Sequence, residues 1–268
     1  MKKLILLILC CLVCCANGFC TTQAGFSVSE DTKVVFSEGN VQYHPKKDMW
    51  RFAPNQYDII GKANKDMSSS YNGWVDLFGW GTGNNPCLVS GNYKDYTEFV
   101  DWGVNFESND SQWRTLTEKE WMYLLCVREN ANKLLGIGTV AGIGGIFILP
   151  DNANLSDNEI DFISLAEQGA VQKWACYSLD DELVLNNYTT KQWEVLETVG
   201  VVFLPFVGKR DAQTVEQTGD SGYYWSSEIE PTSPFRSYGL LMSNMSFNIK
   251  QPISKQVGCA VRLVYNIK

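Results

Sequence analysis

Two segments of this sequence begin with the same pattern, Thr-x-Lys-(Glu or Gln)-Trp-x-x-Leu, at residues 117–124 and 189–196. A threonine followed three residues later by Glu or Gln forms a capping box, which satisfies the free N–H groups at the start of a helix. Apolar residues follow the first box at helical spacing, which predicts a helix from Thr117 to about Asn130. The second pattern predicts a helix that Gly200 closes.

An apolar run ending in Leu-Pro follows each predicted helix, at residues 145–150 and 201–205. Short apolar runs of this length are typical of buried strands. The intervening distances differ too much for a tandem repeat, so we expect two equivalent helix-to-strand units within one domain. The glycines from 136 to 145 are not a phosphate-binding loop, because that motif needs a strand before it and a helix after it. We expect them to form close turns before the strand around Phe147.

Short strands separated by turns are predicted over much of the remaining chain. They lie at residues 26–28, 34–36, 41–43, 50–52, 222–227, 238–242, 246–249 and 259–264. Residues 61–112 are rich in Gly, Asn, Ser and Asp but also in tryptophan, which predicts a long ordered loop region rather than a linker. Two helices among many short strands make the expected fold class α+β.

The N-terminus has the pattern of a secretory signal peptide. Two lysines precede twelve apolar residues, and small residues at Ala16 and Gly18 predict cleavage after Gly18. The apolar run is shorter than the ~20 residues of a membrane span, and no later stretch approaches that length. We therefore expect residues 1–18 to be removed and residues 19–268 to be secreted or held at the outer surface. Residues 12–15 loosely resemble a lipobox, so a lipid anchor is the alternative to free secretion.

The charge of the chain excludes two classes of partner. Its formal net charge of −8 becomes −10 once the two lysines of the signal peptide are removed. An acidic surface argues against nucleic acid and anionic membranes as partners, because both require basic patches. The single histidine, His44, argues against histidine-rich metal sites and against a histidine-based hydrolase.

The remaining titratable residues do not form a recognisable metal site. Five cysteines follow the signal peptide, at positions 20, 87, 126, 176 and 259, and their spacing fits neither a disulfide framework nor a C-x-x-C motif. One or two bridges and isolated buried thiols remain as alternatives. Asp151, Asp157, Glu159 and Asp161 do not have the spacing of an EF-hand, so we expect a solvated acidic loop and no metal.

A series of motifs points to a known family. In chain order they are VFSEGNVQY at 35–43, WRFA at 50–53, QYDIIG at 56–61, GWVDLFGWGT at 73–82, DWG at 101–103, WRTLTxxEW at 113–121, ILPD at 148–151, VFLP at 202–205, GxR at 208–210, GxYWSS at 222–227 and GxxVRLV at 258–264. Nearly the whole mature chain resembles the Fibrobacter succinogenes major paralogous domain proteins, which are common in Bacteroidetes and similar to C-type-lectin-like domains. Residues 153–185 match poorly and are expected to be an elaborated loop.

The resemblance implies two helices packed on a twisted antiparallel sheet, with the N- and C-terminal strands side by side and long loops above. In lectin-like domains a disulfide often ties the first helix to the last strand, and Cys126 and Cys259 occupy those elements. Against that bridge, Cys126 lies about 140° around the helix from Trp121. The calcium motifs of true lectins are missing, since residues 225–227 read Trp-Ser-Ser and residues 230–232 read Glu-Pro-Thr.

The function expected from this resemblance is calcium-independent binding of a glycan or protein by a non-enzymatic, lectin-like domain without a cofactor. The candidate ligand-binding residues are Tyr223, Tyr224, Glu228 and Arg236, around the loop after Trp225. The opposing interpretation packs Tyr224 and Trp225 in the core and uses other tryptophans to pin the long loops.

Two other functions remain open. One is a structural cell-surface protein without a small ligand. The other is a relative of the formylglycine-generating oxidases, which belong to the same superfamily. Those enzymes need a close pair of active-site cysteines, which the spacing of Cys87, Cys126, Cys176 and Cys259 does not provide.

Overall fold

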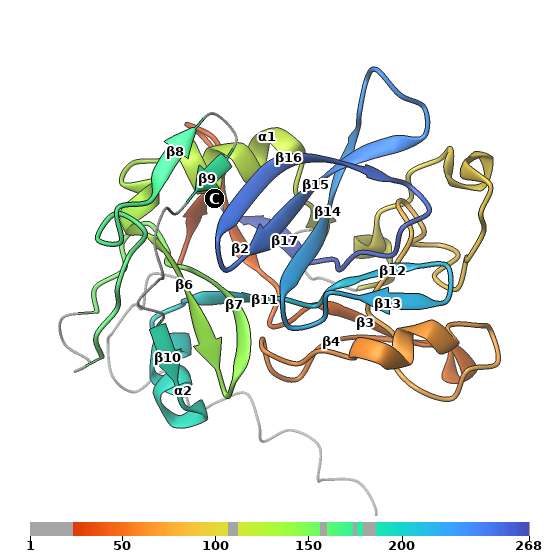
Figure 1. Cartoon of the computed structure of the whole chain (residues 1–268), viewed down its shortest axis with the longest axis horizontal. Helices are drawn as coiled ribbons and strands as arrows, with labels where there is room; N and C mark the ends of the chain where they lie inside the picture. The colour runs from red at the N-terminus through yellow and green to blue at the C-terminus, as the bar shows by residue number, and fades with distance from the viewer. Residues whose placement is uncertain (1–23, 107–111, 156–159, 174–175, 179–185, 268) are drawn as a thin grey trace, which may run out of the picture.

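The computed structural model describes residues 24–106, 112–155, 160–173, 176–178 and 186–267. In these residues strands are many and helices few, so the fold is of the mixed α+β kind that the sequence predicted. The strands form three larger sheets and two short two-stranded ribbons (Figure 1).

The first sheet joins the two ends of the described chain. Its order is β1 (Phe26–Ser27), β2 (Lys33–Phe36), β17 (Leu263–Ile267) and β5 (Arg114–Thr115). All neighbours are antiparallel, and Val264 of β17 is opposite Phe36 of β2. The expected side-by-side placement of the N- and C-terminal strands is therefore present.

The second sheet contains the glycine-rich segment. Its order is β10 (Asn186–Tyr188), β6 (Leu135–Val140), β7 (Ile143–Ile148) and β11 (Val202–Pro205). The apolar runs before the two Leu-Pro pairs are thus paired strands, β7 and β11. The expectation that the glycines form turns is confirmed for Gly142, which lies between β6 and β7 with φ 81°. It is wrong for Gly136 and Gly138, inside β6, and for Gly144 and Gly145, inside β7. At Gly138 the reason is the close approach of β10, because a Cβ there would lie 1.7 Å from the carbonyl oxygen of Asn186. A Cβ on Gly136 would lie 2.7 Å from the ring of Phe162.

The third sheet is antiparallel and carries the C-terminal hairpins. Its order is β14 (Ser221–Ile229), β15 (Arg236–Ser243), β16 (Ser246–Ser254), β9 (Cys176–Ser178) and β8 (Val171–Lys173). The strands predicted at residues 238–242 and 246–249 lie within β15 and β16, which pair with each other. The two ribbons pair β3 (Val41–His44) with β4 (Met49–Phe52) and β12 (Lys209–Asp211) with β13 (Thr214–Glu216).

Both predicted helices start at their capping boxes. Thr117 and Glu120 exchange hydrogen bonds at the start of α1 (Glu118–Met122), and Thr189 and Gln192 do so at α2 (Thr190–Thr198). The first helix ends earlier than expected, because α1 passes into a single π-helical turn, η5 (Tyr123–Val127). In Figure 1, α1 lies above the third sheet and α2 beside β10. The short 3-10 turns are η1 (Pro45–Lys47), η2 (Gly61–Asp66), η3 (Tyr93–Tyr96), η4 (Trp102–Asn105) and η6 (Ala131–Lys133).

Tryptophans fix the long loop region to the third sheet. Trp80 and Trp225 are fully buried in one cluster, and their indole N–H groups cross between the loop and β14. Trp80 donates to the Ser226 carbonyl at 3.0 Å, and Trp225 donates to the Phe78 carbonyl at 2.7 Å. Trp102 is buried in the same cluster. The long loop region that the sequence predicted is thus ordered, and two indole hydrogen bonds hold it to β14. Its residue Tyr93 lies beside Phe235 of the β14–β15 loop.

Among the described residues no helix is long and apolar enough to cross a membrane.

Candidate functional site

The two predicted tyrosines face opposite sides of β14. Tyr224 is fully buried; its hydroxyl donates to the Pro205 carbonyl at 2.9 Å and accepts from the Asn40 amide at 3.1 Å. Burial raises the pKa of Tyr224 well above its ordinary value. The prediction that Tyr224 contacts a ligand is therefore wrong, because it is a hydrogen-bonded core residue. Tyr223 is half-buried, and its hydroxyl donates to Gln217 at 2.7 Å.

The other two predicted residues have different neighbours. Glu228 accepts a hydrogen bond from the backbone N–H of Glu118 at 3.1 Å, so its carboxylate serves the start of α1. Arg236 is exposed, and its Nε lies 2.7 Å from a carboxylate oxygen of Glu230. Tyr223, Glu228 and Arg236 thus bind three different partners. Of the three, only Arg236 adjoins an aromatic residue of the exposed loops, since it follows Phe235 in the chain.

The exposed loops present a pair of accessible rings from two distant parts of the chain. Tyr93 of η3 and Phe235 of the β14–β15 loop meet edge to face, with ring centroids 4.3 Å apart. Phe235 is 47% exposed and Tyr93 is half-buried. We call Tyr93 and Phe235 the aromatic pair. In Figure 1 the β14–β15 loop rises at the upper right, beside the dark yellow loops that include η3.

A polar cavity of about 250 Å³ adjoins the same turn. We call it the loop pocket; it is lined by Trp80, Gly81, Thr82, Asn84, Asn85, Leu88, Asp95, Thr97, Glu98 and Val100. The turn η3 carries both Tyr93 of the aromatic pair and Asp95 of the pocket. A backbone link also connects the two, because Trp80 N–H donates to the Lys255 carbonyl at 2.8 Å and Lys255 N–H donates to the Phe235 carbonyl at 3.0 Å.

The two acidic side chains of the loop pocket differ in their partners. Asp95 accepts from the Ser90 hydroxyl at 2.5 Å, which ties η3 to the preceding loop. Glu98 is exposed, and its carboxylate has no hydrogen bond or ion pair within the described chain. A nearby ammonium is withdrawn from solvent: Lys255 is 3% exposed, and its Nζ lies 4.5 Å from the centre of the Trp80 ring. Burial lowers the pKa of Lys255.

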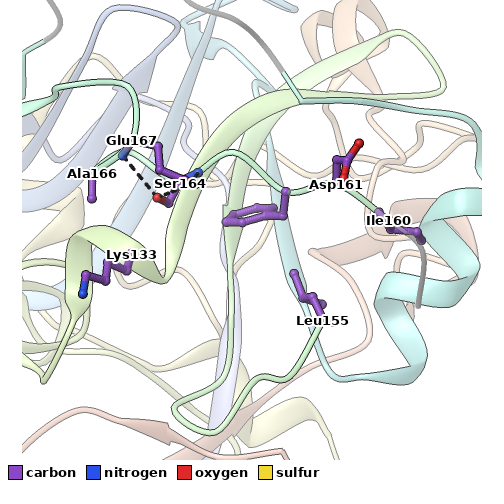
Figure 2. A pocket seen from close by; sticks show the side chains of 8 residues that line it. Lys133, Leu155, Ile160, Asp161, Ser164, Ala166 and Glu167 are labelled. Carbon is purple, nitrogen blue, oxygen red and sulfur yellow. Dashed lines mark hydrogen bonds between the residues drawn. The ribbon is translucent and has the colours of Figure 1, made fainter. Parts of the chain in front are cut away.

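A larger cavity, of about 590 Å³, lies near β6 (Figure 2). Its lining includes Lys133, Asp161 and Phe162, but two other lining residues, Leu155 and Ile160, flank residues outside the described chain. The Glu167 carboxylate there is bound internally, accepting from the N–H and hydroxyl of Ser164 at 2.7 Å each. The residues of the aromatic pair and the loop pocket, by contrast, all lie away from such segments.

No family model, no curated protein and no solved structure matches this chain.

The histidine and the acidic residues that the sequence analysis considered as metal or catalytic groups have structural contacts wherever the structure describes them. His44 is buried, with its ring edge-on to Trp74 at 5.3 Å. Asp151 binds Arg128 and Lys33, each at 3.0 Å, whereas Asp157 and Glu159 lie outside the described residues. Within the described ranges no three His, Cys, Asp or Glu side chains are grouped for a metal ion.

The implied bridge between Cys126 and Cys259 is not formed in this structure. Cys259 is a fully buried free thiol in the cluster of Trp80 and Trp225, and burial raises its pKa strongly. Cys126 lies on η5 and packs, half-buried, against a different cluster that surrounds α1. Cys126 lies on the turn that continues the first helix, whereas Cys259 is outside the last strand, β17, in an isolated bridge opposite Phe78. The two residues therefore lie in separate parts of the core.

Sequence reasoning missed the aromatic pair and the pocket. The available signal was the density of aromatic and amide residues within 61–112, which predicted ordered loops but not their partners.

Proposed function

We propose that this protein is a non-enzymatic, calcium-independent glycan-binding domain with a C-type-lectin-like fold. The observation that carries the proposal is the accessible aromatic pair, Tyr93 and Phe235, beside a polar pocket in the long loops. Sugars present C–H faces that pack on aromatic rings and hydroxyls that bond to amides and carboxylates. The loop pocket offers the amides of Asn84 and Asn85 and the carboxylates of Asp95 and Glu98, and Asp95 lies on the same turn, η3, as Tyr93.

The fold part of the proposal has separate support. Two capped helices, adjacent N- and C-terminal strands and a long tryptophan-pinned loop region are all expected of a lectin-like domain. Calcium independence is supported by the position where true lectins carry a metal-binding tripeptide. There Ser226 is buried, and its hydroxyl donates to the Tyr238 carbonyl at 2.7 Å, so it is committed to the sheet.

We also propose that residues 1–18 direct export and that residues 19–268 act as one domain, secreted or at the outer surface. The support is the N-terminal sequence, in which two lysines precede twelve apolar residues and small residues occupy the cleavage positions. A lipid anchor near Cys15 remains the alternative to free release.

A glycan array probed with the purified full-length protein, with calcium and again with a chelator, tests the binding function. We expect binding that survives chelation. Phe235→Ala and Tyr93→Ala should each weaken it about tenfold, because stacking on an aromatic ring contributes on the order of 1 kcal/mol or more and the two rings support each other. Met245→Ala removes a 64% exposed apolar side chain at the β15–β16 turn and is the matched control.

Two results would contradict the proposal. Binding that disappears with the chelator would exclude calcium independence. No binding to any glycan, with or without calcium, would leave the structural surface protein as the better interpretation.

A further inference from the structure

The free polar groups of the loop pocket are suited to hydroxyls. Asn84, Asn85, Thr97 and Glu98 are exposed, and their side chains have no hydrogen-bond partner within the described chain. A carboxylate accepts hydrogen bonds only, whereas an amide or a hydroxyl both donates and accepts. A sugar hydroxyl does both, so it can donate to Glu98 and accept from an asparagine amide.

The charge of the pocket is one-sided. Asp95 and Glu98 line it, and no lysine or arginine appears among its described lining residues. Two cationic side chains near the pocket have other contacts. Arg236 forms an ion pair with Glu230, and the Lys255 ammonium is buried against the ring of Trp80. Lys94 is exposed on η3 but does not line the pocket. An anionic ligand would therefore meet two carboxylates, and no lysine or arginine, in the lining of the pocket.

The size of the pocket limits its occupant. Its volume of about 250 Å³ is below the roughly 300–1,000 Å³ of sites that enclose drug-sized ligands. One sugar ring is of suitable size, and the adjoining aromatic pair offers a face for the next ring or for the outer side of the same ring.

We infer that the loop pocket binds a single terminal sugar unit without negative charge and rejects the acidic form of that sugar. This inference rests on the proposed glycan-binding function. It adds the ligand class, and it assigns Glu98 as the residue that determines specificity through its charge.

The test compares each hexose with its uronate, for example glucose with glucuronate and galactose with galacturonate, because the pair differs only at C6. Affinities are measured by calorimetry on the full-length protein at low salt and in 1 M NaCl. For any hexose that binds, we expect the uronate to bind at least about fivefold more weakly at low salt, since like charges a few ångströms apart repel. The difference should shrink in 1 M NaCl, where the Debye length is about 3 Å.

A charge reversal provides the second arm. Glu98→Lys should raise uronate affinity about tenfold relative to the matching hexose, because it replaces the repulsion with an attraction. Glu129→Lys is the matched control: Glu129 is exposed in the turn after η5 and does not line the pocket, and the change in net charge is identical. Glu98 is also exposed, so neither substitution disturbs the core.

The outcomes separate the two proposals. Uronates that bind as tightly as their hexoses, or a Glu98→Lys variant with an unchanged preference, would overturn the inference while leaving glycan binding intact. An array on which only acidic glycans bind would do the same. No binding to any neutral or acidic glycan would overturn the proposed function, and the ligand class would fall with it.

Discussion

At the scale of single residues, the buried carboxyl of Asp76 makes stability depend on pH. Asp76 is 1% exposed; it accepts from the Asn64 amide at 2.7 Å and from the Ile60 N–H at 3.0 Å. Burial, which outweighs these hydrogen bonds, raises the pKa of Asp76 from 3.8 to about 6. Because the folded pKa is above the unfolded one, the folded state binds the proton more tightly. The resulting stabilisation is complete below about pH 4 and is lost as pH rises through 6.

The expected loss is about 3 kcal/mol, from a shift of roughly two pKa units at 1.36 kcal/mol each. Urea unfolding of the wild type and of Asp76→Asn between pH 4 and 7.5 measures it, since the amide does not titrate and other groups cancel in the difference. The wild type should lose stability relative to the variant as pH rises. A difference that stays constant across this pH range would contradict the assignment.

The sequence did not show which residues of a strand are exposed when other parts of the molecule cover both of its faces. Tyr224 packs in the cluster around α1, and its neighbour Trp225 packs in the cluster of the long loops. Alternation along β14 therefore separates the residues into two faces without showing which face is accessible. The aromatic pair was out of reach for another reason, because Tyr93 and Phe235 meet only through the tertiary placement of two loops.

At the scale of secondary-structure elements, the sequence predicted correctly the features that depend on residues close together in the chain, such as the starts of the two helices. The two capping boxes involve residues three apart, and both formed as expected. The glycine at position 138 of β6 is required by β10, a strand almost fifty residues later in the chain, and the sequence alone did not show that strand as a neighbour. The parallel pairing of β10 with β6 is the reason that Gly138 carries no side chain.

Gly138→Ala tests this close pairing of strands. The added Cβ would lie 1.7 Å from the Asn186 carbonyl oxygen, so β10 must move and its pairing with β6 must weaken. We expect the free energy of unfolding to fall by about 2 kcal/mol or more. Gly91→Ala is the control, because nothing lies within 4 Å of its added Cβ. Equal urea midpoints for the two variants would show that β10 leaves room for a Cβ at position 138 of β6, which would contradict the close pairing of these strands.

At the scale of the whole molecule, the last strand closes the fold. β17 lies between β2 and β5, so it is hydrogen-bonded on both sides to strands from the first half of the chain. Leu263 and Val264 are fully buried, and they belong to two different core clusters. The N-terminal and long-loop regions therefore share one C-terminal strand, which couples their stability.

Truncation after Arg262 tests that coupling. Removing β17 exposes the facing edges of β2 and β5 and withdraws buried apolar area from two clusters at once. Because a domain's net stability is only about 5–15 kcal/mol, this loss should abolish cooperative unfolding rather than lower its midpoint slightly. Thermal melts followed by near-ultraviolet circular dichroism, which reports the buried tryptophans, measure the effect. Removal of Lys268 alone should leave the melt unchanged. A truncated chain that still melts in one sharp transition would show that the sheets of the molecule are stable without their shared strand.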